Sequence, residues 1–227
     1  MSEALKPVRI WDLPTRLFHW ALALSVVASI ASAKIGGAAM VWHFRLGYLA
    51  LGLILFRLVW GLVGGHWSRF STFVTSPLTV WRYLRTGGGA SAQRLDIGHN
   101  PLGAWSVLAM LALLAFQVAT GLVADDEIAN LGPLNRLVSS ETALLATSWH
   151  RGVGEKVLIG LLVLHVAAIA YHRFRKGQDL LRPMWTGDKT LPANTPASAD
   201  GWPHRLKALV IAGAAAAVVA WIIRLGT

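Results

Sequence analysis

The chain has 227 residues, of which 55% are hydrophobic and only 14% are charged. A soluble domain carries about 25% charged residues, so this composition predicts one membrane domain with short loops. The net charge of +10 comes from basic residues between the hydrophobic runs. This placement indicates that the basic residues contact lipid headgroups and set the orientation of the chain in the membrane, and we expect no nucleic acid partner. Cysteine is absent, which excludes disulfides, iron–sulfur clusters, thiolate-ligated haem and covalent haem attachment.

Five apolar runs are each about long enough to cross a roughly 30 Å hydrocarbon core as a helix. They are Leu17–Ala33, His43–Val63, Leu102–Ala124, His150–Tyr171 and Leu206–Ile223. The fifth run is rich in alanine and could instead form a peripheral helix. Pro, Ala, Ser and Thr dominate the stretch before it, which predicts a flexible linker at residues 190–205. The expected organisation is an all-α bundle of residues 1–189, this linker, and a C-terminal transmembrane helix at 206–227.

The loops predict the orientation of the chain. Basic residues gather in the N-terminal arm, in loop 64–101 and in loop 172–205, which share one side if five helices alternate. The longer connection on the other side contains Asp125, Asp126, Glu127 and Glu141. Basic loops stay in the cytoplasm. We therefore expect a multi-pass protein of the cell inner membrane with a cytoplasmic N-terminus.

Four histidines, His19, His43, His150 and His165, lie in or at the ends of apolar runs. Any one of them alone could be a helix-end histidine bonded to a carbonyl or to water. The topology sorts the set into two pairs, with His19 and His165 near the cytoplasm and His43 and His150 near the outside. His150 and His165 are 15 residues apart, about 22 Å along a helix and roughly 60° apart around it. One helix can thus present both imidazoles to the bundle interior, where each pair could hold a six-coordinate haem.

Other residues could support such sites. Gly47 and Gly154 follow His43 and His150 by one turn and could leave room for a flat ring. Arg16 and Arg57 fall at the depth of the cytoplasmic pair and could bind a propionate, or could reach lipid headgroups instead. His172, seven residues after His165, could be a propionate partner, a quinone contact or a proton carrier, or only an interfacial residue.

The motifs and their order resemble the prokaryotic cytochrome b561 family, which is related to the b-type cytochrome subunit of nickel–iron hydrogenases. The stretches that carry this likeness are IWDLPTRLFHW, VWHFRLGYLALGLILFRLVWGL, GHNPLGAWSVLAMLALLAFQVATGLVADDE, WHRGVGEKVLIGLLVLHVAAIAYHRF and LLRPMWTGDK. The resemblance implies a four-helix core with two haem b groups, whose iron ligands match His19, His43, His150 and His165. The family's last two ligands are commonly one residue closer together than the 15 seen here.

These observations predict a membrane-bound di-haem b-type cytochrome. It would carry electrons across the membrane between a redox partner, such as a periplasmic c-type cytochrome, and the quinone pool. The candidate quinone site lies at the cytoplasmic face, near His172. One alternative is a superoxide oxidase that reduces ubiquinone, which would make the chain an oxidoreductase in the narrower sense. Another is a haem-free helical transporter or assembly factor. No motif for acid–base or nucleophilic catalysis is present, and the oligomeric state is left open.

Overall fold

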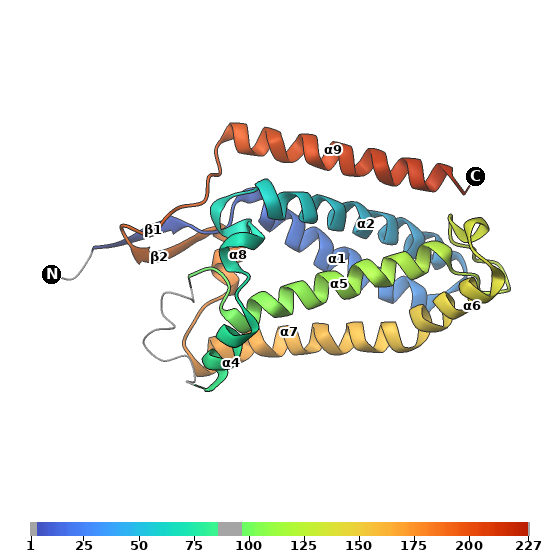
Figure 1. Ribbon diagram of the computed structural model, residues 1–227, viewed down its shortest axis with the longest axis horizontal. Coiled ribbons are helices and arrows are strands. Elements are labelled where there is room, and N and C mark those ends of the chain that lie inside the picture. The colour runs from blue at the N-terminus through green and yellow to red at the C-terminus, as the bar shows by residue number, and fades with distance from the viewer. Residues whose placement is uncertain (1–3, 86–96, 227) are drawn as a thin grey trace. The chain divides into compact units, whose positions relative to one another are not determined.

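The computed structural model describes residues 4–85 and 97–226, which are mostly helical (Figure 1). The α-helices are α1 (Leu13–Ile35), α2 (Met40–Val63), α3 (Phe70–Phe73), α4 (Pro77–Arg85), α5 (Pro101–Val123), α6 (Ser140–Trp149), α7 (Glu155–Arg175), α8 (Leu181–Thr186) and α9 (Trp202–Arg224). Short 3₁₀ turns form at Gly37–Ala39, His66–Ser68 and Asn135–Leu137, and a π-helical turn at His150–Gly154. The strands are β1 (Leu5–Arg9) and β2 (Asp188–Pro192).

Within residues 4–85 and 97–226, five helical segments are long and apolar enough to span a membrane, which confirms the expected multi-pass, all-α membrane fold. The fourth of them is longer than its apolar run, because α6, the π-helical turn and α7 form one helical segment over Ser140–Arg175. Its start is set by Ser139, whose side chain accepts a hydrogen bond from the N–H of Thr142. Such a cap satisfies one of the free N–H groups at a helix start.

Over the described residues the chain forms two compact units. Unit 1 comprises Met1–Leu17, Arg57–Ala109 and Ile169–Leu209. Unit 2 comprises Phe18–Phe56, Met110–Ala168 and Val210–Thr227. Each of the five long helices contributes residues to both units.

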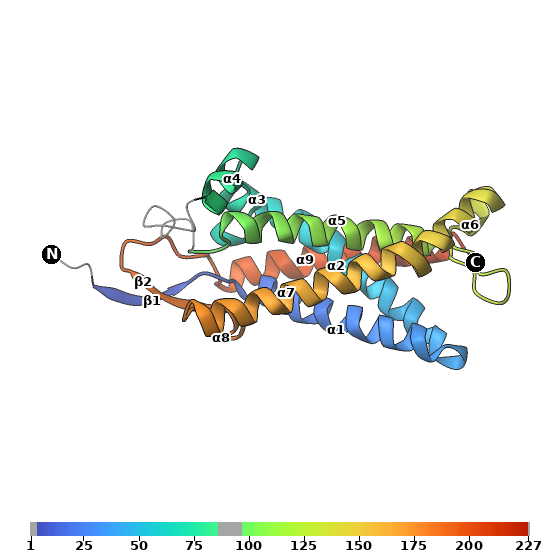
Figure 2. The ribbon, with the colours of Figure 1, turned by 90° about the horizontal axis from the view of Figure 1, so that it is seen from below.

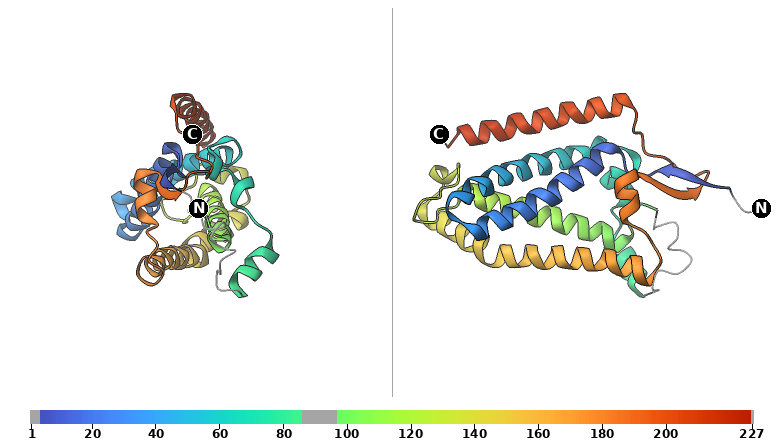
Figure 3. Two further views of the ribbon diagram at one scale, coloured as in Figure 1. Left: turned by 90° about the vertical axis from the view of Figure 1, so that its left-hand side faces the viewer. Right: turned by 180° about the vertical axis from the view of Figure 1, so that it is seen from behind.

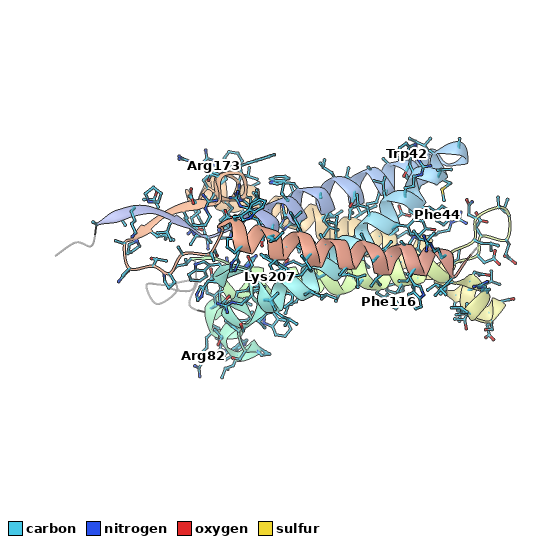
Figure 4. The ribbon with its side chains drawn as sticks, turned by 90° about the horizontal axis from the view of Figure 1, so that it is seen from above. Trp42, Phe44, Arg82, Phe116, Arg173 and Lys207 are labelled. Carbon is cyan, nitrogen blue, oxygen red and sulfur yellow. The ribbon has the colours of Figure 1, made fainter. Side chains whose placement is uncertain are left out.

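Unit 1 contains an antiparallel pair of strands, in which β1 and β2 run from Leu5 opposite Pro192 to Arg9 opposite Asp188 (Figure 2). In the same unit the fully buried Asp12 accepts hydrogen bonds from the backbone N–H of Thr15, the indole of Trp60 and the hydroxyl of Ser68. A buried carboxylate is stable when its oxygens are satisfied in this way. Three basic side chains of this unit, Arg82, Arg173 and Lys207, are labelled in Figure 4.

The segment expected to be a flexible linker makes defined contacts within unit 1. Ser198 is buried, and its backbone N–H and hydroxyl donate to the carbonyls of Arg9 and Ile10, each at 2.7 Å. The indole of Trp67 donates to the carbonyl of Pro196 at 2.7 Å. Composition alone does not reveal these long-range hydrogen bonds. Helix α9 also begins earlier than its apolar run, at Trp202.

Unit 2 has a core to which four helices contribute. Val26 of α1, Ile54 of α2, Leu114 of α5 and Leu158 of α7 form its buried centre. The C-terminal part of α9 lies along α2 (Figures 1 and 3), where a Cβ at Gly52 would sit 3.6 Å from a methyl of Val219.

Large apolar side chains also cover the outside of unit 2. Trp42 and Phe116, both labelled in Figure 4, expose more than half of their surface. Such exposure is costly in water and is expected against lipid.

Candidate functional site

The four histidines singled out from the sequence belong to unit 2, where they form two pairs. The imidazole rings of His43 and His150 have centroids 5.8 Å apart and planes at 86°. The rings of His19 and His165 have centroids 6.4 Å apart and planes at 52°. All four are partly buried. The structure therefore brings together the two pairs that the topology argument predicted.

Hydrogen bonds fix the ring orientation in the His43/His150 pair. Nδ1 of His43 lies 3.0 Å from the backbone carbonyl oxygen of Ser29 and 3.0 Å from its hydroxyl. Nδ1 of His150 lies 2.8 Å from the carbonyl oxygen of Gln117 and 3.3 Å from the hydroxyl of Thr120. A carbonyl can only accept, so each Nδ1 is the protonated nitrogen. Each Nε2 then carries the lone pair, as metal-binding histidines require.

A cavity of about 380 Å³ lies beside this pair, within the size range of cofactor pockets. Its lining is mostly apolar and includes His43, His150, Gly47, Phe44 and Tyr48. A cavity of this composition suits a flat, largely apolar cofactor whose metal is bound from two sides.

Three glycines near the ligands play different parts. A Cβ at Gly47 would meet nothing within 4 Å, which agrees with a glycine that leaves room beside His43. A Cβ at Gly121 of α5 would lie 2.9 Å from Cε1 of His150, closer than real Cβ contacts allow. At Gly154 the space is filled by the side chains of Gln117 and Trp149. The explanation offered for Gly154, room for a ring, is thus replaced by close packing of α5 and the π-helical turn.

The His19/His165 pair has different surroundings. Nδ1 of His19 is buried and has no hydrogen-bond partner among the described residues. Its ring instead contacts the indole of Trp20 edge-on, at 5.0 Å between centroids. A buried, unpaired ring nitrogen costs about 1–3 kcal/mol. This orphaned nitrogen shows that His19 is not held by a backbone carbonyl as His43 and His150 are.

The spacing of both pairs fits an iron between the rings. An imidazole nitrogen binds a metal ion at about 2 Å. Adding half a ring on each side puts the two centroids roughly 6 Å apart. The observed 5.8 and 6.4 Å agree with this value. Both pairs are therefore compatible with haem iron ligated by two histidines.

The π-helical turn at His150–Gly154 accounts for the long spacing between the two candidate ligands of the fourth segment. A π-helical turn holds one residue more than an α-helical turn. The 15 residues from His150 to His165 therefore behave like about 14 residues of α-helix. That is the spacing common in the family, so the extra residue does not argue against His150 as a ligand.

Arg16 and Arg57 belong to unit 1. Arg16 donates to the carbonyl of Trp185 at 2.5 Å and lies 3.8 Å from a carboxylate oxygen of Asp200. Arg57 is only 2% exposed, and its guanidinium lies 4.7 Å above the ring of Phe70. Arginine so deeply buried is unusual in a membrane helix. Their role as propionate partners stays a prediction.

His172 lies in the last turn of α7 and is partly exposed. Its Nδ1 is 2.8 Å from the side-chain oxygen of Gln178, whose backbone N–H donates to the carbonyl of His172. This contact closes the end of the helix. It leaves Nε2 available, so the predicted role at a quinone site remains a prediction.

Four residues around the His43/His150 pair were not recognised from the sequence: Ser29, Gln117, Thr120 and Gly121. Gln117 and Thr120 are polar residues inside a long apolar run, and this is the signal that could have revealed them. Ser29 lies near His43 Nδ1 through both its hydroxyl and its backbone carbonyl, and the carbonyl has no signal in the sequence. Gly121 resembles any small residue in a membrane helix.

A membrane helical bundle that carries two pairs of facing imidazoles, one of them beside an apolar cavity, is the arrangement expected of a membrane cytochrome. The family model for prokaryotic cytochrome b561 matches residues 10–187 of this chain. The chain belongs to this family and is a membrane b-type cytochrome.

Curated relatives share this description. A protein of Cupriavidus necator named "Probable Ni/Fe-hydrogenase B-type cytochrome subunit" is 26% identical over 83% of this chain and 89% of its own length. A protein of the same name from Azotobacter chroococcum is 27% identical over 79% of this chain and 87% of its own. The "Probable Ni/Fe-hydrogenase 1 B-type cytochrome subunit" of Escherichia coli is 24% identical over 69% of this chain and 80% of its own length. No solved structure matches the chain.

Proposed function

We propose that this chain carries electrons across the cell inner membrane, between a nickel–iron hydrogenase and the quinone pool, by means of two haem b groups. The observation that carries the proposal is the pairing of four histidines at 5.8 and 6.4 Å within unit 2. Bound there, haem iron cycles between the ferric and ferrous states and so accepts and passes on one electron at a time. The chain's own residues hold the two irons, orient the imidazoles and exclude water.

Each ligand pair has a separate task in this proposal. His43 and His150 would hold the iron nearer the outside, because their protonated Nδ1 atoms leave both Nε2 lone pairs free to bind a metal. His19 and His165 hold the iron nearer the cytoplasm. Because α7 and the π-helical turn before it supply one ligand to each pair, the two sites share a rigid spacing.

The hydrogenase partner is inferred from the relatives, which are named as B-type cytochrome subunits of Ni/Fe-hydrogenases. A periplasmic c-type cytochrome is the other partner class that the expected topology allows. The two partner classes are distinguished by adding hydrogen and a nickel–iron hydrogenase to membranes that contain the haem-loaded protein. Reduction of both spectral components within seconds supports the hydrogenase, and reduction only after addition of a reduced c-type cytochrome contradicts it.

The acceptor is a quinone at the cytoplasmic face, with His172 delivering a proton through its free Nε2. Reduction of a quinone consumes two protons with two electrons, so a titratable group near the bound quinone is needed. The variant His172→Gln keeps a side chain of similar size that can form hydrogen bonds but cannot take up and release a proton. Reoxidation of the haems by quinone should become at least about tenfold slower, with both haem spectra intact. Unchanged kinetics would remove His172 from the site.

One observation counts against the alternative of superoxide oxidation. Asp126 lines the cavity beside His43 and His150, and hydrogen bonds from the side chain and backbone of Asn130 and from the N–H of Ala129 lower its pKa. The carboxylate is therefore ionised at neutral pH and repels an anion such as superoxide. A superoxide pulse that reduces the haems at a diffusion-limited rate would nevertheless establish this activity.

The decisive functional test uses sealed vesicles that contain the haem-loaded protein. Ferricyanide is trapped inside, and a membrane-impermeant reductant is added outside. Electrons should cross, and the trapped ferricyanide should be consumed at a rate proportional to the protein present. The matched control is His19→Ala. This variant should keep the spectral component of the His43/His150 pair but no longer transfer electrons across the membrane. Equal rates for the two proteins would contradict transfer through two haems.

A further inference from the structure

The strongest unassigned feature of unit 2 is a contact between α5 and the π-helical turn. It involves both the backbone carbonyl and the side-chain amide of Gln117. Its backbone carbonyl accepts the hydrogen bond from Nδ1 of His150 at 2.8 Å. Its side-chain amide donates to the backbone carbonyl of His150 at 2.7 Å. The ring and the backbone of His150 are thus both tied to the same residue.

The cost of this arrangement indicates a function. Gln117 is 8% exposed, and its side-chain oxygen is buried without a hydrogen-bond partner among the described residues. An unsatisfied buried polar atom costs about 1–3 kcal/mol, and an apolar residue of equal size at this position would avoid the cost. Packing alone therefore does not explain a glutamine here.

The surrounding residues preserve the space for this amide. A Cβ at Gly154 would collide with the side-chain oxygen of Gln117 and would lie 2.6 Å from Nε1 of Trp149. A Cβ at Gly121, one turn after Gln117, would collide with the ring of His150. Two glycines on different helices thus permit the close approach of α5 to the π-helical turn.

The geometry points to Gln117 as a positioning residue for the iron ligand His150. This inference rests on the proposed function, in which His43 and His150 hold one haem. The backbone carbonyl of Gln117 accepts the hydrogen bond from Nδ1–H of His150. The side-chain amide of Gln117 holds the backbone of His150 and so keeps that hydrogen bond short. A firm Nδ1–H···O=C bond makes the imidazole a stronger electron donor and favours ferric iron. Gln117 therefore lowers the potential at this site, whereas His19, with an unpaired Nδ1, has no such support.

The test is Gln117→Leu, which keeps the size of the side chain and the backbone carbonyl but removes the amide that holds the backbone of His150. Without that contact the Nδ1–H···O=C bond of His150 should lengthen and weaken. Potentiometric titration, followed by optical and paramagnetic resonance spectra, measures each haem separately, and the component lost in His43→Ala identifies the affected site. We expect reduction of that component to become easier by at least tenfold, about 59 mV for one electron. The component of His19 and His165 should change by less than twofold.

Two further variants keep the result interpretable. Ser25→Ala removes another buried hydrogen bond of unit 2, from the Ser25 hydroxyl to the carbonyl of Leu22, and should leave both potentials unchanged. Gly154→Ala displaces the Gln117 amide without removing it and should reproduce the shift if Gln117→Leu fails to fold. Unshifted components, a shift of both together, or the same shift in Ser25→Ala would overturn the inference. A protein without haem at His43 and His150 would overturn the proposed function as well.

Discussion

The two histidine pairs of unit 2 have similar ring distances but different support. His43 and His150 each place Nδ1 against a backbone carbonyl, beside an apolar cavity. His19 has a buried Nδ1 without a partner among the described residues and is held by an aromatic contact. The comparison teaches that ligand spacing and ligand orientation are separate properties. In the proposed function, two haem groups held at similar ring distances would therefore receive different electron donation from their ligands.

The largest expected effect comes from removing the ligands themselves. His43→Ala and His150→Ala should each abolish the same spectral component, because both ligate one iron. His19→Ala and His165→Ala should abolish the other. Optical spectra of the four reduced, purified proteins give the measurement. If His19→Ala and His43→Ala removed the same component, the pairing and the comparison built on it would be wrong.

A pair of deletions tests the part played by the π-helical turn. Deleting Val153 converts the turn to ordinary α-helix and leaves the two candidate ligands 14 positions apart (165 − 150 − 1), so both haems should be retained. Deleting Ile159, in the α-helical part of α7, rotates His165 by roughly 100° relative to His150. This second protein should lose at least one haem, as a haem assay would show. Equal haem content in the two deletion proteins would contradict the role of the turn.

A smaller effect is expected from Gly121→Ala, which adds one methyl group 2.9 Å from Cε1 of His150. The His150 ring must move by a few tenths of an ångström. The paramagnetic resonance signal of the His43/His150 component should therefore shift, while the signal of the His19/His165 component should not. Gly160→Ala, where a Cβ meets nothing within 4 Å, is the matched control. A shift of the His19/His165 component instead would show that the two sites are not independent.

Much of the site was predictable because buried histidines in apolar runs are rare and costly. The alternation of basic loops then sorted the four histidines into the observed pairs. The support of the paired histidines was only partly predictable. The backbone carbonyls of Ser29 and Gln117 leave no signal in the sequence, whereas the Gln117 side chain is a polar group inside a long apolar run. The π-helical turn was equally hidden, since it depends on how α5 packs against His150. In unit 1, composition suggested a linker where Ser198 and Pro196 make long-range hydrogen bonds.

The central claim is that one chain holds two haem b groups, each between two histidines. The most direct test measures haem content per chain by the pyridine haemochrome method, together with a low-temperature paramagnetic resonance spectrum of the oxidised protein. The account predicts two haem b groups per chain and two distinct low-spin signals, because the two ligand pairs differ in their hydrogen bonding. One haem per chain, or a dominant high-spin signal, would contradict it.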